Sequence, residues 1–299
     1  MSATASAARV ETPFRRFLSE FAESKVALFG LSVFTIVALL AIFANWIAPQ
    51  NPYDLSQLDI MDGRLPPGSE SGAGYIYLLG TDDQGRDMFS GMLYGLRISL
   101  GVGVGSALFA ACVGTSLGLT AAFFGRRVEA IIMRLVDLQL SFPSILVALM
   151  ILAILGKSVM NVVLALVIVE WAGYARNVRA VAMVERRKEY IEAASCLALP
   201  WRRIMFRHLL PNCLPPLIVI ATQQVARAIA LEATLSFLGL GVPITEPSLG
   251  LLIANGFQYM LSGKYWISFY PGLALLVTIV SINLVGDHLR DVLNPRLKR

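Results

Sequence analysis

Few residues of this chain have the types and spacing that catalysis requires. Its two histidines, His208 and His288, both fall outside the long apolar runs, so a buried triad or metal cluster built on them is not expected. Gly156-Lys157-Ser158 matches the end of a phosphate-binding loop, but that motif needs a glycine where this chain has Ile151. The sequence therefore predicts that the chain is not an enzyme, and any pumping would need a partner or an ion gradient.

The other chemically interesting residues are charges inside apolar segments. Each costs about 2.5–3.5 kcal/mol at the centre of a membrane helix on insertion scales, so each needs a reason. Arg134 and Asp137 are three residues apart on one helix face, where they could pair or reach the membrane surface. Glu170 could be a boundary residue. Arg227 and Glu232 lie deeper, and they either face a translocation path between subunits or pair with a neighbouring helix.

The elements that must position these charges are membrane helices. The chain has 299 residues, of which 56% are hydrophobic and 15% charged, with a mean hydropathy of +0.67. An average soluble domain has about 25% charged residues, so this composition excludes a soluble enzyme, a disordered chain, a collagen and a coiled coil. The net charge of +5 comes from basic residues in the connections without interleaved aromatic residues, so nucleic acid is not an expected partner.

About 20 consecutive apolar residues cross a bilayer as a helix. Six segments fit, which predicts an all-α, multi-pass membrane protein. The first is too long for a cleavable signal peptide and should remain as an anchor. The predicted spans are Val26–Ala48, Ile98–Phe124, Leu138–Leu155 (with its helix starting near Ile131), Val159–Ala175, Pro211–Ala226 (continuing through Arg227 and Glu232) and Ile267–Gly286.

The distribution of positive charge predicts the orientation. Of the 23 Lys and Arg residues in the connections, 18 lie on the side of both termini, which are therefore predicted to be cytoplasmic. The inner connection 176–210 is predicted to form a helix over Val184–Leu199, a break, and a second helix from Pro200. The predicted divisions are a cytoplasmic segment 1–25, helix 26–48, a periplasmic segment 49–97, helices 2–6 over 98–286, and a cytoplasmic tail 287–299.

Two glycine pairs and several prolines should shape the helix packing. Gly101 and Gly105, like Gly114 and Gly118, form small-residue stripes that admit a second backbone, either from this chain or from another subunit. Pro143 and the pair Pro215-Pro216 should bend their helices.

Five segments in a fixed order carry a resemblance that covers nearly the whole chain. Within Leu79–Asp87, the signature residues are Gly80, Thr81, Asp82, Gly85, Arg86 and Asp87. The other segments are Ala41–Pro49, Trp171–Arg179, Glu232–Gly241 and Asn283–Asp291 with Pro295. Together they resemble the C-type permease subunit of ABC importers of the dipeptide/oligopeptide/nickel family. The end of the first span and Pro211–Ile218 look most like a dipeptide permease, although longer peptides, nickel chelates and glutathione stay open as cargo.

This resemblance implies a type I ABC importer permease fold in the bacterial inner membrane. It implies a second, B-type permease subunit, two subunits that bind ATP and Mg, and a periplasmic or lipid-anchored substrate-binding protein, with no cofactor in this chain. The family's EAA-type motif implies that Glu192, Ala193, Ala194 and Ala198 form the helix that docks on the ATPase. Ala198 stands where the family has glycine, Leu249 where tryptophan is frequent and Asn294 where aspartate is usual.

Two further expectations concern the outer segment and the competing function. Thr81 and Gln84 are predicted to form a capping box for a helix leading into the second span, in a segment that shapes the docking surface for the binding protein. The alternative function is a self-sufficient secondary transporter with Glu170, Arg227 and Glu232 as an ion relay. The lack of a visible inverted repeat and the large basic inner loop argue against it.

Overall fold

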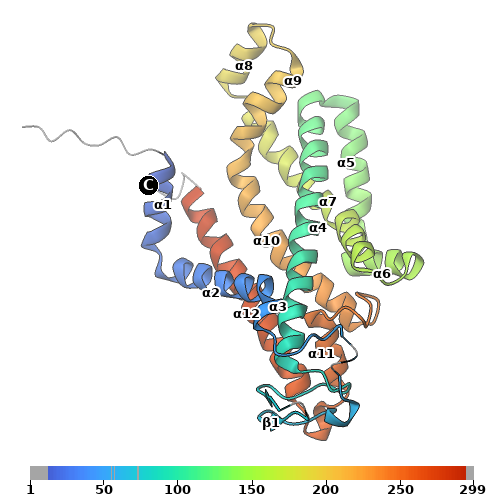
Figure 1. The fold of residues 1–299 in the computed structure, drawn as a ribbon. Helices are drawn as coiled ribbons and strands as arrows, with labels where there is room; N and C mark the ends of the chain where they lie inside the picture. The colour runs from blue at the N-terminus through green and yellow to red at the C-terminus, as the bar shows by residue number, and fades with distance from the viewer. Residues whose placement is uncertain (1–12, 55, 57, 73, 294–299) are drawn as a thin grey trace, which may run out of the picture.

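The computed structural model describes residues 13–54, 56, 58–72 and 74–293, and it is almost entirely helical (Figure 1). Five helices are long and apolar enough to cross a membrane, and one bent helix pair makes a sixth candidate span. The prediction of an all-α multi-pass protein is confirmed, and its six predicted spans correspond to these five helices and the bent pair. Residues 1–12 and 294–299, which include Asn294 and Pro295, lie outside the described residues, and the orientation of the termini stays a prediction.

The helices extend beyond the apolar runs that identified them. The five single spans are α2 (Lys25–Ile42), α4 (Met88–Phe124), α7 (Val159–Glu185), α10 (Leu210–Phe237, preceded by helical turns from Trp201) and α12 (Trp266–Leu293). The bent pair is α5 (Arg126–Ser141) and α6 (Ser144–Leu155). The shorter elements are α1 (Pro13–Glu23), α3 (Ala44–Ile47), α8 (Glu189–Cys196), α9 (Trp201–Arg203), α11 (Leu249–Phe257), β1 (Ser69–Glu70) and β2 (Ile76–Tyr77).

Prolines explain one of the expected bends. α5 and α6 meet at an angle of 89°, and Pro143 stands directly before α6. Because proline lacks an amide hydrogen and disfavours a helical residue before it, the helix ends there and restarts in a new direction. Pro215 and Pro216 lie inside α10, which remains one helix, and a π-helical turn at Ile204–Leu209 precedes it.

The second span starts ten residues before Ile98 because of its cap. The Asp87 carboxylate accepts hydrogen bonds from the Ser90 backbone N–H at 2.8 Å and from its hydroxyl at 2.6 Å, so α4 begins at Met88. The predicted capping box is wrong. The Thr81 hydroxyl instead donates to the Asp62 carbonyl at 2.6 Å and accepts from the Leu65 N–H at 2.7 Å, which places it inside the outer segment.

The two glycine stripes of α4 have different surroundings. A Cβ on Gly114 would lie 2.5 Å from the Trp171 carbonyl oxygen, and one on Gly118 would lie 2.6 Å from the Ala175 carbonyl oxygen. These glycines let α4 pack closely on α7 within the chain. A Cβ on Gly101 or Gly105 would meet no atom of the described residues within 4 Å, so this stripe faces outward.

Candidate functional site

The segment with the EAA-type motif forms α8, at the end of the molecule opposite β1 (Figure 1). The helix predicted over Val184–Leu199 is divided, since α7 continues to Glu185 and α8 begins at Glu189. The predicted second helix does begin after Pro200, as the short α9.

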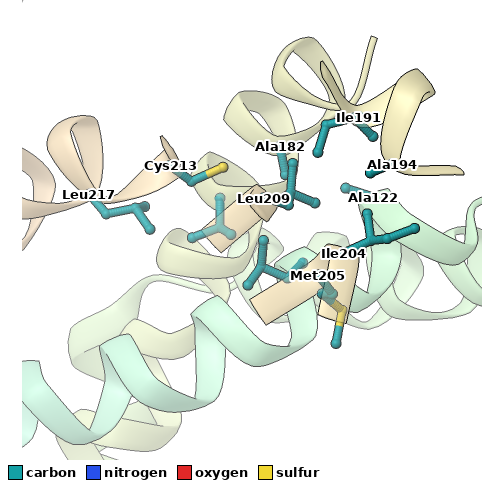
Figure 2. Close-up of a cluster of buried hydrophobic side chains, with 11 residues drawn as sticks. Ala122, Ala182, Ile191, Ala194, Ile204, Met205, Leu209, Cys213 and Leu217 are labelled. Carbon is teal, nitrogen blue, oxygen red and sulfur yellow. The ribbon is translucent and has the colours of Figure 1, made fainter. Parts of the chain in front are cut away.

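α8 is held by one apolar face. Ile191 and Ala194 point into a buried cluster that also takes side chains from α4, α7 and the start of α10 (Figure 2). The other labelled members are Ala122, Ala182, Ile204, Met205, Leu209, Cys213 and Leu217. Because these residues come from four segments, α8 packs directly on the ends of the neighbouring helices.

The four predicted coupling residues do not share one face. Ala194 is only 5% exposed and belongs to the cluster, whereas Glu192, Ala193 and Ala198 are exposed. Leu197, which belongs to no predicted site, is 74% exposed beside them. The exposed surface of α8 is therefore formed by Glu192, Ala193 and Leu197, with Ala198 directly after them, whereas Ala194 belongs with Ile191 to the face that packs on the protein.

Ala198 explains why a glycine is favoured at its position. It has φ +54°, in the left-handed region, where α8 ends. The Leu199 N–H returns to the Ala194 carbonyl at 3.3 Å, as in a helix C-terminal cap. A Cβ in this conformation costs about 1–2 kcal/mol, a strain that glycine avoids.

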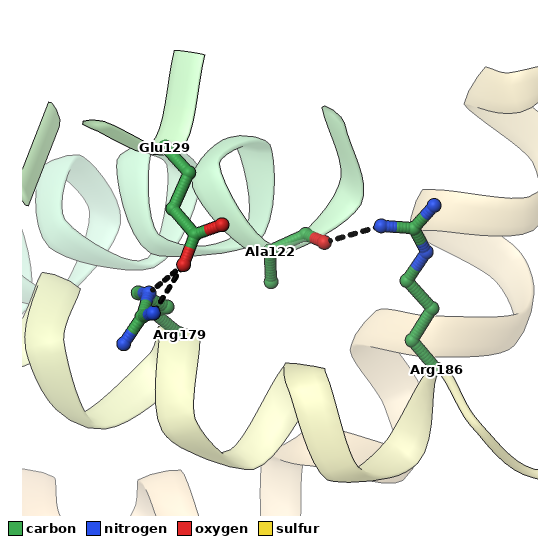
Figure 3. Close-up of polar contacts among 4 residues, drawn as sticks. All are labelled: Ala122, Glu129, Arg179 and Arg186. Carbon is green, nitrogen blue, oxygen red and sulfur yellow. Dashed lines mark hydrogen bonds and ion pairs between the residues drawn. The ribbon is translucent and has the colours of Figure 1, made fainter. Parts of the chain in front are cut away.

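Charged residues join the end of α7 to its neighbours through contacts that no sequence motif indicated. Arg179 forms an ion pair with Glu129 of α5, and Arg186 donates to the Ala122 carbonyl of α4 at 2.8 Å (Figure 3). Glu185 accepts from the Tyr190 hydroxyl at 2.7 Å, which fixes the start of α8. Burial and this carboxylate raise the pKa of Tyr190. The partners of Arg179 and Arg186 lie 50 and 64 residues away along the chain, so sequence spacing alone could not identify these two contacts.

The charges inside the spans form separate contacts. Asp137 pairs with Arg176 of α7 at 2.5 Å, whereas the sequence had offered Arg134 as its partner. Glu170 pairs with Arg227 of α10, with 3.4 Å between Oε1 and Nε. A cavity of about 50 Å³ lies beside this pair.

Glu232 has different surroundings from Arg227. It is fully buried and accepts hydrogen bonds from the hydroxyls of Ser99 at 2.8 Å and Ser236 at 2.7 Å. The Ser99 oxygen also accepts the Leu249 N–H at 3.3 Å, so this network joins α4, α10 and the start of α11. The structure therefore does not bring Arg227 and Glu232 together.

The outer signature residues build a folded turn. The Asp82 carboxylate accepts the N–H groups of Gln84 at 2.8 Å and Arg86 at 2.9 Å, and its burial raises its pKa to about 6. Gly85 has φ +79°, and a Cβ there would overlap the Asp59 carbonyl oxygen. Gly80 has φ +80° and packs on Trp266 of α12. These residues give the segment its shape.

Residues 114–299 match the family described as binding-protein-dependent transport system inner membrane component, and residues 12–67 match the N-terminal TM domain of oligopeptide transport permease C. The chain belongs to the binding-protein-dependent permease family. The expectation drawn from the five motifs is therefore confirmed, and the protein is a multi-pass inner-membrane permease of an ABC importer.

Several relatives of this permease match almost end to end. The di/tripeptide transport system permease protein DppC of Pseudomonas aeruginosa is 39% identical over 96% of this chain and 93% of the relative. The dipeptide transport system permease proteins DppC of Haemophilus influenzae and Escherichia coli K12 are 38% and 42% identical, over 97% and 96% of this chain and 97% and 95% of those relatives.

The fold of this permease also matches a solved structure. A chain from the inward-facing MetNI methionine ABC transporter aligns with a TM-score of 0.56 and 21% identity, over 69% of this chain and 97% of that one. At this identity the likeness shows the fold alone.

Proposed function

We propose that this chain is one of two permease subunits of an ATP-driven importer of dipeptides. Its partners are a B-type permease, two ATPase subunits that bind ATP and Mg, and a periplasmic or lipid-anchored substrate-binding protein. The cargo is supported by the names of relatives 38–42% identical over nearly the full length. The outward-facing stripe of Gly101 and Gly105 supports close packing with the second permease.

The observation that carries the coupling role is the two-sided character of α8. Ile191 and Ala194 anchor it in the cluster of Figure 2, and Glu192, Ala193 and Leu197 are exposed on the other side. A small residue between a carboxylate and an apolar side chain suits docking into a groove of a partner. When the two ATPase subunits close on ATP, they displace α8.

Two contacts then spread this motion through the permease. Arg186 ties the end of α7 to α4, and the Arg179–Glu129 pair ties α7 to α5 (Figure 3). These helices respond as rigid bodies, which opens the path to one side of the membrane at a time. Arg227 lies on this path, whereas Glu232, five residues later on the same helix, is buried in the hydroxyl network and does not face it.

The test uses the complete importer in proteoliposomes, with ATP inside and uptake of a radiolabelled dipeptide as the readout. Ala193→Trp and Glu192→Lys should each abolish ATP-driven uptake because they obstruct the docking face. Ala193→Ser and Glu192→Gln, which keep the size of the side chain, should retain most of it. Wild-type uptake by both disruptive variants would overturn the docking role.

A second arm tests the subunit role itself. The chain alone should transport nothing under a proton or sodium gradient. Gradient-driven uptake by the chain alone would overturn the proposed function in favour of the secondary transporter.

A further inference from the structure

A half-exposed arginine lies well inside a membrane span of this protein. Arg227 belongs to α10 (Leu210–Phe237), and its side chain is 56% exposed in the isolated chain. A cation facing lipid at this depth costs several kcal/mol, so the surface around Arg227 has to meet water or protein. On the proposed function, that surface is the path for the peptide.

The guanidinium is held from one side. Its Nε lies 3.4 Å from Oε1 of Glu170, a residue that is only 4% exposed. The other Glu170 oxygen accepts a hydrogen bond from the Gln224 amide at 2.6 Å, which fixes the carboxylate. Among the described residues, Glu170 is the only ion-pair partner of Arg227, and it contacts Nε, which leaves both terminal nitrogens of the guanidinium available.

Two buried polar side chains line the cavity beside this pair. The amide nitrogen of Gln139 has no hydrogen-bond partner in the described part of the chain, and Oε1 of Glu170 has only the ion pair with Arg227. Both residues line the cavity of about 50 Å³, together with Ser144, Gly173 and Arg227. An unpaired buried donor is costly, so the Gln139 amide favours an occupant that offers an acceptor oxygen.

The size and charge of the site select that occupant. A cavity of about 50 Å³ admits one or two water-sized groups, so it can take one end of a peptide and not the whole molecule. A guanidinium with two free terminal nitrogens matches the two oxygens of a carboxylate. The adjacent Glu170 charge keeps the affinity moderate, which a transit site needs because its ligand must leave.

We propose that Arg227 forms a transit site for the free C-terminal carboxylate of the imported peptide, with Glu170 and Gln224 as positioning residues. This inference rests on the proposed function. It places part of the substrate selectivity in the permease, in addition to that of the binding protein.

The experiment compares a dipeptide with its C-terminal amide in proteoliposomes that contain the complete importer. Each uptake rate is measured with saturating binding protein, and the readout is the ratio of the carboxylate rate to the amide rate. Because the same binding protein serves every variant, a change in this ratio between variants comes from the permease. Uptake rather than binding is measured, so a merely structural defect lowers both rates and leaves the ratio unchanged.

Arg227→Gln should lower the ratio about tenfold, the loss expected for one charge-assisted pair. The double variant Arg227→Gln with Glu170→Gln should do the same while leaving no buried charge unpaired, which covers the case in which the single variant does not fold. Arg227→Lys keeps the charge without the planar fork and should give an intermediate ratio. Arg176→Gln removes a similarly exposed arginine, paired with Asp137, and should leave the ratio unchanged.

A wild-type ratio in the double variant, with ATP-driven uptake preserved, would overturn the transit site and leave the proposed function intact. Absence of ATP-driven uptake of both peptides by the wild-type complex would instead overturn the proposed function.

Discussion

Replacing glycine with alanine should have opposite effects on the stability of the protein at two positions of α4. At Gly114, a Cβ would meet the Trp171 carbonyl oxygen at 2.5 Å and the Tyr174 Cβ at a still shorter distance, and a Cβ of Gly114→Ala cannot rotate away. At Gly101, the same methyl group meets no described atom within 4 Å. Both substitutions are from glycine to alanine in the same helix, so they gain similar helix propensity. The difference between their stabilities therefore measures the cost of packing at Gly114.

The magnitude follows from these distances. Gly114→Ala forces α4 and α7 apart, and overpacking of this kind costs about 1–3 kcal/mol. Gly101→Ala gains helix propensity of about 0.5–1 kcal/mol without a steric cost. At about 2–4 °C per kcal/mol, the first variant should lower the Tm by about 2–12 °C and the second should raise it by about 1–4 °C.

Thermal unfolding of the purified chain in mild detergent, followed by tryptophan fluorescence, measures both values. The chain has four tryptophans, and Trp171 lies at the contact itself. An unchanged Tm for Gly114→Ala, or a larger fall for Gly101→Ala, would refute the assignment of the two stripes.

Three further variants test other local features. Ala198→Gly removes the backbone strain of an alanine in the left-handed region and should stabilise α8 by about 0.7 kcal/mol, which slows hydrogen exchange of its amides about threefold. Faster exchange would contradict the assigned strain. Burial raises the pKa of Asp82 from its ordinary 3.8 to about 6 in the folded protein. Between these two values the folded state binds more protons than the unfolded state, so the free energy of unfolding falls as pH rises from about 4 to about 6. Asp82→Asn should remove this fall when thermal unfolding is followed from pH 4 to pH 8, and an unchanged profile would disprove the cause. Ser99→Ala removes a hydroxyl donor from buried Glu232 and should cost about 1.5–3 kcal/mol, whereas Thr234→Ala, which removes an exposed hydroxyl, should cost little in the same thermal unfolding experiment.

The sequence predicts the spans well because hydrophobic length is a local property. The position of the bend at Pro143 is likewise local, since proline acts on its own turn of helix. α11 was missed because its nine residues are too few for a span and resemble an ordinary apolar loop segment. Both Thr81 and Asp87 are good capping residues by type, and only the path of the outer segment decides between them.

The parts of the site that the sequence could not predict depend on packing between distant segments. The two glycine stripes have the same spacing, yet one faces α7 and the other faces outward. The same holds for Glu170 and Arg227, which meet only because α7 packs on α10. The exposed and buried alanines of α8 are adjacent residues, and the direction from which α10 returns decides which one is covered.

Because α7 is one uninterrupted helix, it connects the proposed ATPase-docking end of the protein with the proposed transit site at Arg227. Glu170 and Glu185 are on this one helix, about 22 Å apart along its axis. A rigid tilt of about 5° about the Glu185 end would carry Glu170 sideways by about 2 Å. The distance of 3.4 Å between Glu170 and Arg227 would then exceed the range of an ion pair. A small displacement at the Glu185 end of α7 is thus sufficient to break or re-form the ion pair between Glu170 and Arg227, without unwinding any helix.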